Sequence, residues 1–219
     1  AAADLARRGR SVVLLDKAGR IKPCGGAIPP RLIRDFEIPD GLLVAKIRSA
    51  RMIAPSDKRV MMPIDGGFVG MVDREVFDEW LRSRAAAVGA DRRTGSFLRI
   101  SREGDGVATV HYRSGDGAEE SVRTRTVIGA DGALSAVAKQ EVPSATRMKC
   151  VFAYHEIVRA PTGAKADFNP ESCDVWYQGV LSPDFYAWIF PHGDTTSIGT
   201  GSARKGFALR RSVGDLRAA

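Results

Sequence analysis

The chain of 219 residues is long enough for one large domain or two small ones. Its composition, 44% hydrophobic and 27% charged, is typical of globular proteins. No apolar run approaches the roughly 20 residues that a membrane span needs. The net charge of +7 could attract anionic partners, but the arginines are scattered without interleaved aromatic residues, which favours a solvated surface and argues against nucleic-acid binding. The three cysteines are widely spaced and form neither a disulfide framework nor a metal-ligand pattern, so we expect no metal. The N-terminus carries charges where a signal peptide is apolar, so we expect a cytoplasmic protein.

The first segment has the pattern of half a nucleotide-binding unit. Residues 1–8 predict a helix with small residues on one face, Gly9 stands where a C-terminal cap belongs, and residues 11–15 are a continuous apolar run that ends in Asp16. In a dinucleotide-binding fold an acid at this place accepts hydrogen bonds from ribose hydroxyls, although a surface aspartate at a strand end would look the same. The glycine-rich loop of that fold begins about 20 residues before the acid, so we expect the chain to start inside the helix that follows this loop.

The rest of the chain alternates between helical and strand patterns. Residues 19–41 are rich in Gly and Pro and are predicted to be a loop, whereas residues 90–94 are more polar than a strand there would require. A helix is predicted from Asp73 to Gly89 because apolar residues recur there at helical spacing. Strands are predicted at 46–64 (one or two), 97–102, 107–113, 120–128, 149–159, 173–181, 185–191 and 195–201, and a last helix at 204–217.

This order of elements predicts an α/β fold with two interleaved domains. A nucleotide-binding domain would comprise residues 1–45 and 70–147. A mainly antiparallel sheet, inserted as the substrate-binding domain, would comprise residues 46–69 and 148–219.

The segment from Val127 to Ser135 is the strongest candidate for a binding site. An apolar strand leads into Gly-Ala-Asp-Gly-x-x-Ser, which places the carboxylate of Asp131 at the C-terminal edge of a sheet, where ligands bind in open α/β folds. The adjacent Gly132 permits close approach of the backbone. An ordinary strand–turn–helix connection is the alternative, but residue types, order and context agree with a binding site.

This segment resembles the second flavin motif of the p-hydroxybenzoate hydroxylase superfamily of FAD-dependent oxidoreductases. Residues 73–81, Asp-Arg-Glu-Val-Phe-Asp-Glu-Trp-Leu, resemble the Arg-x-x-Phe-Asp-x-x-Leu helix that precedes that motif. The resemblance implies a three-layer, Rossmann-like FAD/NAD(P)-binding domain in which Asp131 and Gly132 lie beside the ribityl and pyrophosphate part of FAD and Arg74 lies near the flavin. An arginine at a helix N-terminus opposes the helix dipole, which is a reason to expect an anion beside it, although a solvated helix end is the alternative.

Two further segments narrow the resemblance to geranylgeranyl reductases. Residues 22–29, Lys-Pro-Cys-Gly-Gly-Ala-Ile-Pro, are similar to a segment of the chlorophyll and bacteriochlorophyll branch. Residues 186–191, Tyr-Ala-Trp-Ile-Phe-Pro, followed by Gly199 and Gly201, are similar to the Tyr-x-Trp-x-Phe-Pro stretch of the wider family. The resemblance extends over roughly residues 1–202, and several separate motifs in the right order make chance an unsatisfactory explanation.

The aromatic stripe, defined as Tyr186, Trp188 and Phe190, alternates along a predicted strand, so its side chains share one face. With Pro191 it is a candidate wall for a prenyl chain, because each buried methylene contributes about 0.8 kcal/mol. The stripe could equally be the core of the second domain, and the resemblance favours contact with substrate or flavin.

The Cys24–Gly25–Gly26 segment has two interpretations. It is either a backbone hinge that happens to carry a cysteine, or a cofactor-binding loop whose Cys24 thiol orients the substrate or supplies a proton as a catalytic group. The three histidines share no metal spacing, form no recognisable triad and are expected to be structural: His111, His155 and His192.

By resemblance, NADPH reduces bound FAD, and hydride then passes to three of the four double bonds of a geranylgeranyl group, which becomes phytyl. The substrate would be geranylgeranyl diphosphate or geranylgeranyl-(bacterio)chlorophyll, and a peripheral place at a photosynthetic membrane would suit it. The Gly-x-Gly-x-x-Gly loop and the later Gly-Asp motif of the family are absent from the sequence, so we expect weak FAD binding by this chain alone. The alternatives are a flavin monooxygenase or halogenase of the same fold and a non-enzymatic basic binding module.

Overall fold

The computed structural model describes residues 1–17, 24–162 and 167–218. The chain forms two compact units, one comprising Ala1–Arg20 and Glu79–Cys150 and the other Ile21–Asp78 and Val151–Ala219. Residues 24–45 and 70–78, which the sequence pattern grouped with the nucleotide-binding domain, lie in the second unit, and residues 148–150, grouped with the antiparallel sheet, lie in the first. Compactness does not identify a ligand, so the assignment of a cofactor domain and a substrate domain stays a prediction.

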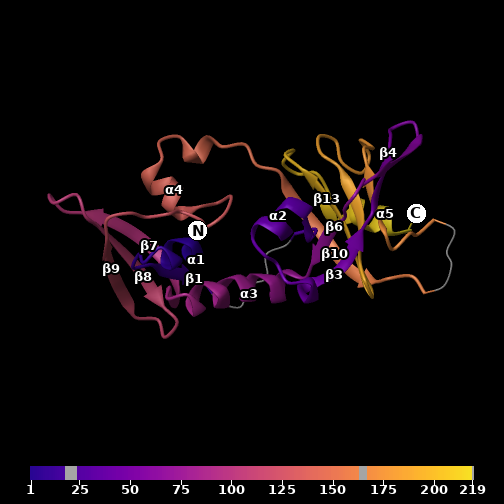
Figure 1. Ribbon diagram of the computed structural model, residues 1–219. Coiled ribbons are helices and arrows are strands. Elements are labelled where there is room, and N and C mark those ends of the chain that lie inside the picture. Colours follow the sequence, from indigo (N-terminus) through magenta and orange to yellow (C-terminus); the bar gives the residue numbers. More distant parts are fainter. Residues whose placement is uncertain (18–23, 163–166, 219) are drawn as a thin grey trace. The chain divides into compact units, whose positions relative to one another are not determined.

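A four-stranded sheet forms the centre of the first unit (Figure 1). Its order is β1 (Val13–Asp16), β7 (Asp91–Arg102), β8 (Ala108–Ser114) and β9 (Glu119–Thr124). The first pair is parallel and the other two are antiparallel. The helical elements are α1 (Ala2–Arg7), α3 (Arg74–Ala87), which begins in the second unit, α4 (Ala136–Glu141) and the 3-10 turn η2 (Ala145–Arg147).

The second unit contains two sheets. The larger has the order β10 (Phe152–Arg159), β13 (Thr195–Ser202), β12 (Ala187–His192), β11 (Ser172–Trp176), β4 (Ser49–Ile53) and β5 (Arg59–Pro63), and only its β4–β11 pair is parallel within the described residues. The smaller has the order β2 (Ala27–Ile28), β6 (Val69–Val72) and β3 (Leu43–Ile47). The helical elements are α2 (Pro30–Asp35), α5 (Leu209–Ala218) and the 3-10 turn η1 (Asp40–Leu42).

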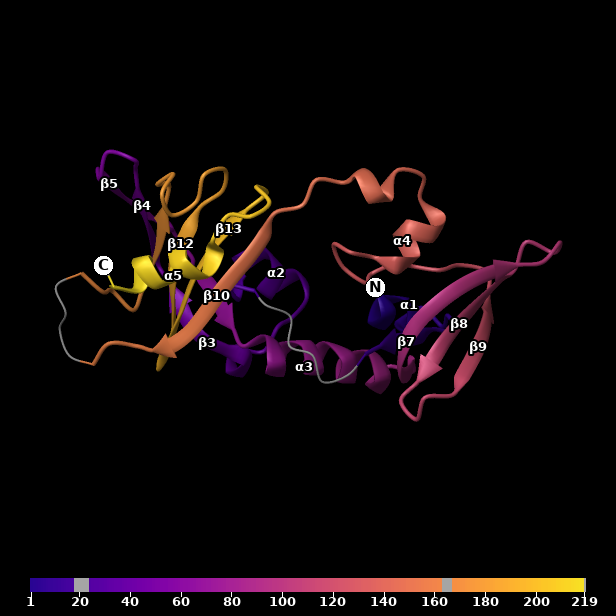
Figure 2. The same ribbon diagram turned by 180° about the vertical axis from the view of Figure 1, so that it is seen from behind.

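The two faces of the six-stranded sheet bury different partners. Helix α5 lies against one face, as Figure 2 shows, and its Val213 and Leu216 pack against Ala187 and Ile198. The other face carries Cys173, which packs with residues of the smaller sheet. Because side chains alternate along β12, every second residue from Trp188 onward belongs to this second face.

The structure corrects three expectations from the sequence. Residues 127–128 form no strand, because β9 ends at Thr124 and, among the described residues, no strand pairs with them to satisfy the backbone. The predicted loop 19–41 contains β2, α2 and η1. Residues 91–94 do belong to a strand, since Arg92 pairs with Glu79 and so accommodates the polar sequence.

Most of the other strands and helices occur where the pattern predicts them, with ends shifted by a few residues. Residues 46–64, predicted as one or two strands, hold β4, β5 and the end of β3, and β6 was not predicted. The α/β fold class is confirmed. Lys22 and Pro23, at the start of the Cys-Gly-Gly segment, lie outside the described residues. None of the helices that the structure describes is long and apolar enough to cross a membrane.

Candidate functional site

The aromatic stripe is continuous in space. The ring centroid of Trp188 lies 5.9 Å from that of Tyr186 and 6.0 Å from that of Phe190. The prediction that the three rings share a face is therefore confirmed. Pro191 is fully buried and, by strand alternation, belongs to the opposite face that α5 covers. The structure thus brings together the aromatic members of the predicted substrate site but not Pro191.

The Cys24–Gly25–Gly26 loop lies directly against this stripe. A Cβ built on Gly25 would lie 3.1 Å from Cδ2 of Phe190, which is closer than side chains normally approach, and 3.7 Å from Nε1 of Trp188, which is an ordinary van der Waals contact. The loop and the stripe enclose a cavity of about 260 Å³ in the second unit. Its lining residues are Cys24, Gly25, Gly26, Ala27, Ala153, His155, Phe185, Tyr186, Trp188 and Phe190.

His192 holds this loop from the sheet. Its Nε2 lies 2.9 Å from the carbonyl oxygen of Gly25, to which it donates in the tautomer that this contact requires. The Nδ1 atom is buried and makes no hydrogen bond with the residues that the structure describes, although it lies 3.5 Å from a carboxylate oxygen of Asp73. Gly26 has φ +75°, and a Cβ there would overlap the imidazole ring and approach the carbonyl oxygen of Val72 to 2.6 Å. Only glycine fits this position, for reasons of packing that do not involve a cofactor.

Arg74 connects the start of α3 to the same loop. Its guanidinium group bonds both carboxylate oxygens of Asp78, at 2.8 and 2.9 Å, and also contacts Cys24. Burial by itself would lower the pKa of Arg74, but the bonds to Asp78 and Cys24 outweigh it and raise that pKa. The anionic neighbour expected from the sequence is therefore Asp78 within the structure, and contact with a flavin stays a prediction.

His155 belongs to a polar network that the sequence analysis missed. Its Nδ1 lies 3.1 Å from Oγ of Ser197, and the same Oγ accepts a hydrogen bond of 3.2 Å from Nε1 of Trp188. These residues stand on β10, β13 and β12, so the network crosses three neighbouring strands. The histidine therefore lines the cavity and is not an isolated surface group.

Asp16 and Asp131 both lie in the first unit. Asp16 ends β1, and its Oδ1 pairs with Nε of Arg82 at 3.1 Å. Asp131 caps α4: it accepts from Ser135, and from the backbone N–H of Ala136 at 2.7 Å and of Val137 at 3.2 Å. Burial would raise the pKa of Asp131, but these hydrogen bonds lower it overall.

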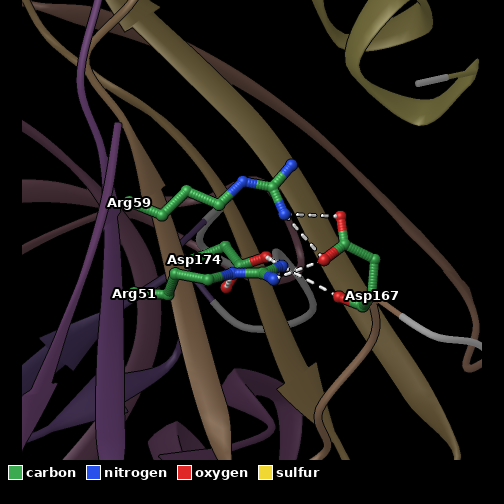
Figure 3. Close-up of polar contacts among 4 residues, drawn as sticks. All are labelled: Arg51, Arg59, Asp167 and Asp174. Atoms are coloured by element: carbon green, nitrogen blue, oxygen red, sulfur yellow. Dashed lines mark hydrogen bonds and ion pairs between the residues drawn. The ribbon is translucent and has the colours of Figure 1, made fainter. Parts of the chain in front are cut away.

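A separate charged cluster lies on β4, β5, β11 and the segment before β11 (Figure 3). Arg51 makes a two-pronged contact with Asp174, in which Nε–Oδ1 is 2.9 Å, and a third bond of 2.6 Å to Asp167. Arg59 also bonds Asp167, at 2.8 and 3.0 Å. The charges of the cluster pair with one another, so we interpret it as a structural tie, meaning an ion-pair cluster that links these strands. Among the described residues, no group of acidic, Cys and His side chains could hold a metal ion.

Comparison with known proteins connects this geometry to a family. The profile described as "FAD binding domain" matches residues 50–165, which is more than half of the chain. The chain belongs to the FAD-binding domain family.

Its relatives in this family include geranylgeranyl reductases, which confirms the resemblance drawn from the motifs. It is 59% identical over 99% of its length to the geranylgeranyl diphosphate reductase of Rhodobacter capsulatus, and 37% identical over 92% to the chloroplastic enzyme of Oryza sativa. It spans about half of each, 55% and 46%. A geranylgeranyl bacteriochlorophyll reductase-like protein from Thermoplasma acidophilum shares the fold, with a TM-score of 0.84 at 22% identity over 98% of this chain and 57% of that one.

Whether the first unit fits FAD can be judged from two acidic residues, Asp16 and Asp131. Asp16 stands at the C-terminal end of a strand in a parallel pair, and its side chain is 40% exposed although Oδ1 pairs with Arg82. An acceptor-only carboxylate in this place fits ribose hydroxyls. Asp131 fits a role in FAD binding less directly, because both of its carboxylate oxygens already accept hydrogen bonds at the start of α4. Gly132 has φ +88° and open space around it, so a ligand could approach its backbone closely.

Proposed function

We propose that the protein is a flavin-dependent geranylgeranyl reductase, in which NADPH is the electron donor and double bonds of a geranylgeranyl group are the acceptors. The observation that carries the proposal is the cavity between the Cys24–Gly25–Gly26 loop and the aromatic stripe. Each side of this cavity is formed by one of the two motifs that resemble geranylgeranyl reductases, although more than 150 residues separate them in the sequence. The names of the curated relatives support the same activity.

In this proposal the chain's own residues hold and orient the prenyl group. Tyr186, Trp188 and Phe190 present a continuous apolar wall, and burial contributes about 0.8 kcal/mol for each methylene. His192 and the two glycines fix the facing loop and so set the width of the cavity. Asp16 would accept the ribose hydroxyls of FAD, which when bound supplies hydride to the double bond.

The finer points of the proposal concern the substrate and its place in the cell. Geranylgeranyl diphosphate is favoured by the names of the curated relatives. A geranylgeranyl-(bacterio)chlorophyll would present the same chain with a larger head, and a peripheral position at a photosynthetic membrane would give access to it. Both substrates use the same cavity, so the aromatic stripe serves either one.

The test uses the protein at its natural full length with bound FAD. NADPH is added without oxygen, and bleaching of the flavin absorbance measures the first half-reaction. Geranylgeranyl diphosphate or geranylgeranyl-bacteriochlorophyll is then added, and mass spectrometry follows the gain of two hydrogens per reduced double bond. We expect flavin reoxidation together with phytyl products. An oxygen-dependent product with an added oxygen or halogen would contradict the proposal and favour the monooxygenase or halogenase alternative.

A further inference from the structure

We propose that His155 delivers the proton that completes reduction of each prenyl double bond, from its Nε2 atom into the cavity. The inference rests on the proposed function and names a catalytic group for it. Reduction of an isolated double bond requires a hydride at one carbon and a proton at its neighbour. In this step the imidazolium of His155 is the acid: the π electrons of the alkene form the new bond to its Nε2 proton, and the Nε2–H bond breaks with its electron pair left on nitrogen, so that the neutral imidazole keeps its other proton on Nδ1. Reduced flavin, when bound, would supply the hydride to the neighbouring carbon, and a proton from solvent restores the imidazolium.

The first argument is the position of His155. It stands on β10 directly opposite Gly199 of β13, and Gly199 is in turn directly opposite Trp188 of β12. All three therefore lie on the face of the sheet that the Cys24–Gly25–Gly26 loop covers. The imidazole and the central ring of the aromatic stripe line one cavity, so a prenyl chain along the stripe would pass the histidine.

The second argument is the direction of the hydrogen bonds. The indole N–H of Trp188 can only donate, so Oγ of Ser197 accepts there, over 3.2 Å. A hydroxyl has one hydrogen and two lone pairs, so the same Oγ can also donate to Nδ1 of neutral His155 or accept from Nδ1–H of the imidazolium, over 3.1 Å. Ser197 thus supports both protonation states without moving a heavy atom, as a proton donor that is used repeatedly requires.

The third argument is the freedom of Nε2. Because Nδ1 is engaged by Ser197, Nε2 is the ring nitrogen left to face a ligand, and in the imidazolium it carries a hydrogen. In the part of the chain that the structure describes, Nε2 has no hydrogen-bond partner, so it is available to a ligand in the cavity. This distinguishes it from His192, whose Nε2 is bonded to the Gly25 carbonyl.

Tyr186, another acid that lines the cavity, is less suited to the role. Burial, with smaller contributions from Tyr177 and Cys24, raises the pKa of Tyr186 and makes the phenol a weaker acid. Burial and then the neighbouring His192 lower the pKa of His155, so its imidazolium is a stronger acid and is less populated than that of a free histidine.

The decisive variant is His155→Asn in the full-length protein with FAD. Asparagine keeps a polar group near the place of Nδ1 but has no acid at Nε2. We expect flavin reduction by NADPH to stay within about twofold of wild type and reduction of the prenyl double bond to slow by about 100-fold or more, the usual contribution of general acid catalysis. The matched control is His111→Asn, because His111 belongs to β8 of the first unit and should change neither rate.

A second readout does not depend on turnover. In ¹⁵N-histidine spectra of the wild-type protein, geranylgeraniol should shift the Nε2 resonance of His155, because the ligand contacts this atom. Ser197→Ala should shift the Nδ1 resonance, because Nδ1 loses its hydrogen-bond partner, and this variant serves if His155→Asn does not fold. Normal prenyl reduction by His155→Asn, or a His155 resonance that geranylgeraniol leaves unchanged, would overturn the inference alone. A wild-type enzyme that reduces no prenyl double bond would overturn the proposed function as well.

Discussion

The indole ring of Trp188 occupies the space in which a side chain of Gly199 would stand, so that a Cβ at residue 199 would overlap the ring. The two residues are directly paired on β12 and β13, and the ring therefore lies across the neighbouring strand and reaches Ser197. The central ring of the aromatic stripe can take this position because Gly199 on the neighbouring strand has no side chain.

Gly199→Ala should displace this ring and destabilise the protein by about 1–3 kcal/mol, the usual cost of adding a methyl group to a filled interior. Chemical denaturation measures the change. Gly214→Ala is the matched control: no atom lies within 4 Å of its added Cβ on α5, and Ala in a helix interior is favoured over Gly by up to about 1 kcal/mol. Equal effects of the two substitutions would show that Gly199 does not shape the stripe.

Trp188→Ala in the full-length enzyme should slow reduction of the prenyl chain or stop it at partly reduced products, because the wall that holds the alkene is lost. Reduction of the flavin by NADPH should stay near normal, and rapid mixing separates the two half-reactions. Trp188→Phe, which keeps a ring, should have an intermediate effect. Loss of FAD binding or of folding in Trp188→Ala would identify the residue as core instead.

His192→Ala should release the Cys24–Gly25–Gly26 loop, because the Gly25 carbonyl loses its donor at a cost of about 1–3 kcal/mol. We expect alkylation of Cys24 to become several times faster, as followed by mass spectrometry of peptides. Cys150 should react at an unchanged rate. Burial raises the pKa of Cys173 to about 12, so this thiol should stay unreactive near neutral pH. An unchanged rate at Cys24 would mean that the hydrogen bond from His192 does not hold the loop.

Asp174→Ala should destabilise the protein by about 3–5 kcal/mol, because it leaves the buried guanidinium of Arg51 with only its bonds to Asp167. Replacing both members of the pair, in Arg51→Met with Asp174→Leu, should cost much less than the sum of the single changes. Urea unfolding of all four proteins in a double-mutant cycle gives the coupling. Additive effects would contradict the interpretation of the cluster as a structural tie.

Asp16→Ala in the full-length protein should weaken FAD binding by roughly tenfold to a hundredfold, corresponding to the loss of hydrogen bonds to a charged group. Fluorescence quenching of the flavin on titration measures the affinity. Asp4→Ala, another acid of the first unit that is exposed on α1, should bind FAD as wild type does. If the two variants bind equally well, Asp16 is only an ion-pair partner of Arg82.

Local patterns in the sequence predicted the parts of the site that lie on one element. Alternation along β12 is a property of any strand, so the shared face of Tyr186, Trp188 and Phe190 followed from their spacing alone. The pairing of His155 with Ser197 could not be read this way, because it depends on which strands become neighbours in the sheet. The signal that could have found it is the alternation of β10, which places Ala153, His155 and Ile157 on one face.

The error at residues 127–128 has the same origin. Their apolar sequence suits a strand, but a strand exists only where another strand supplies hydrogen-bond partners. The Cys-Gly-Gly segment had two interpretations in the sequence, a hinge and a cofactor-binding loop, and the structure adds a packing reason for its glycines that depends on Phe190 and His192. Sequence patterns identified these residues as special without identifying what they contact.

The parallel pairing of β4 with β11 has a consequence for synthesis on the ribosome. Residues 49–53 emerge more than a hundred residues before residues 172–176, the segment with which they pair. During that interval both edges of the β4–β5 hairpin lack a partner strand, and Val60, Met61 and Met62 of β5 stay largely exposed even in the finished fold. Such sequence-distant pairing slows folding and leaves nascent edges open to aggregation. The six-stranded sheet therefore assembles late, and protection of this hairpin by a chaperone would matter most before residue 176 has been made.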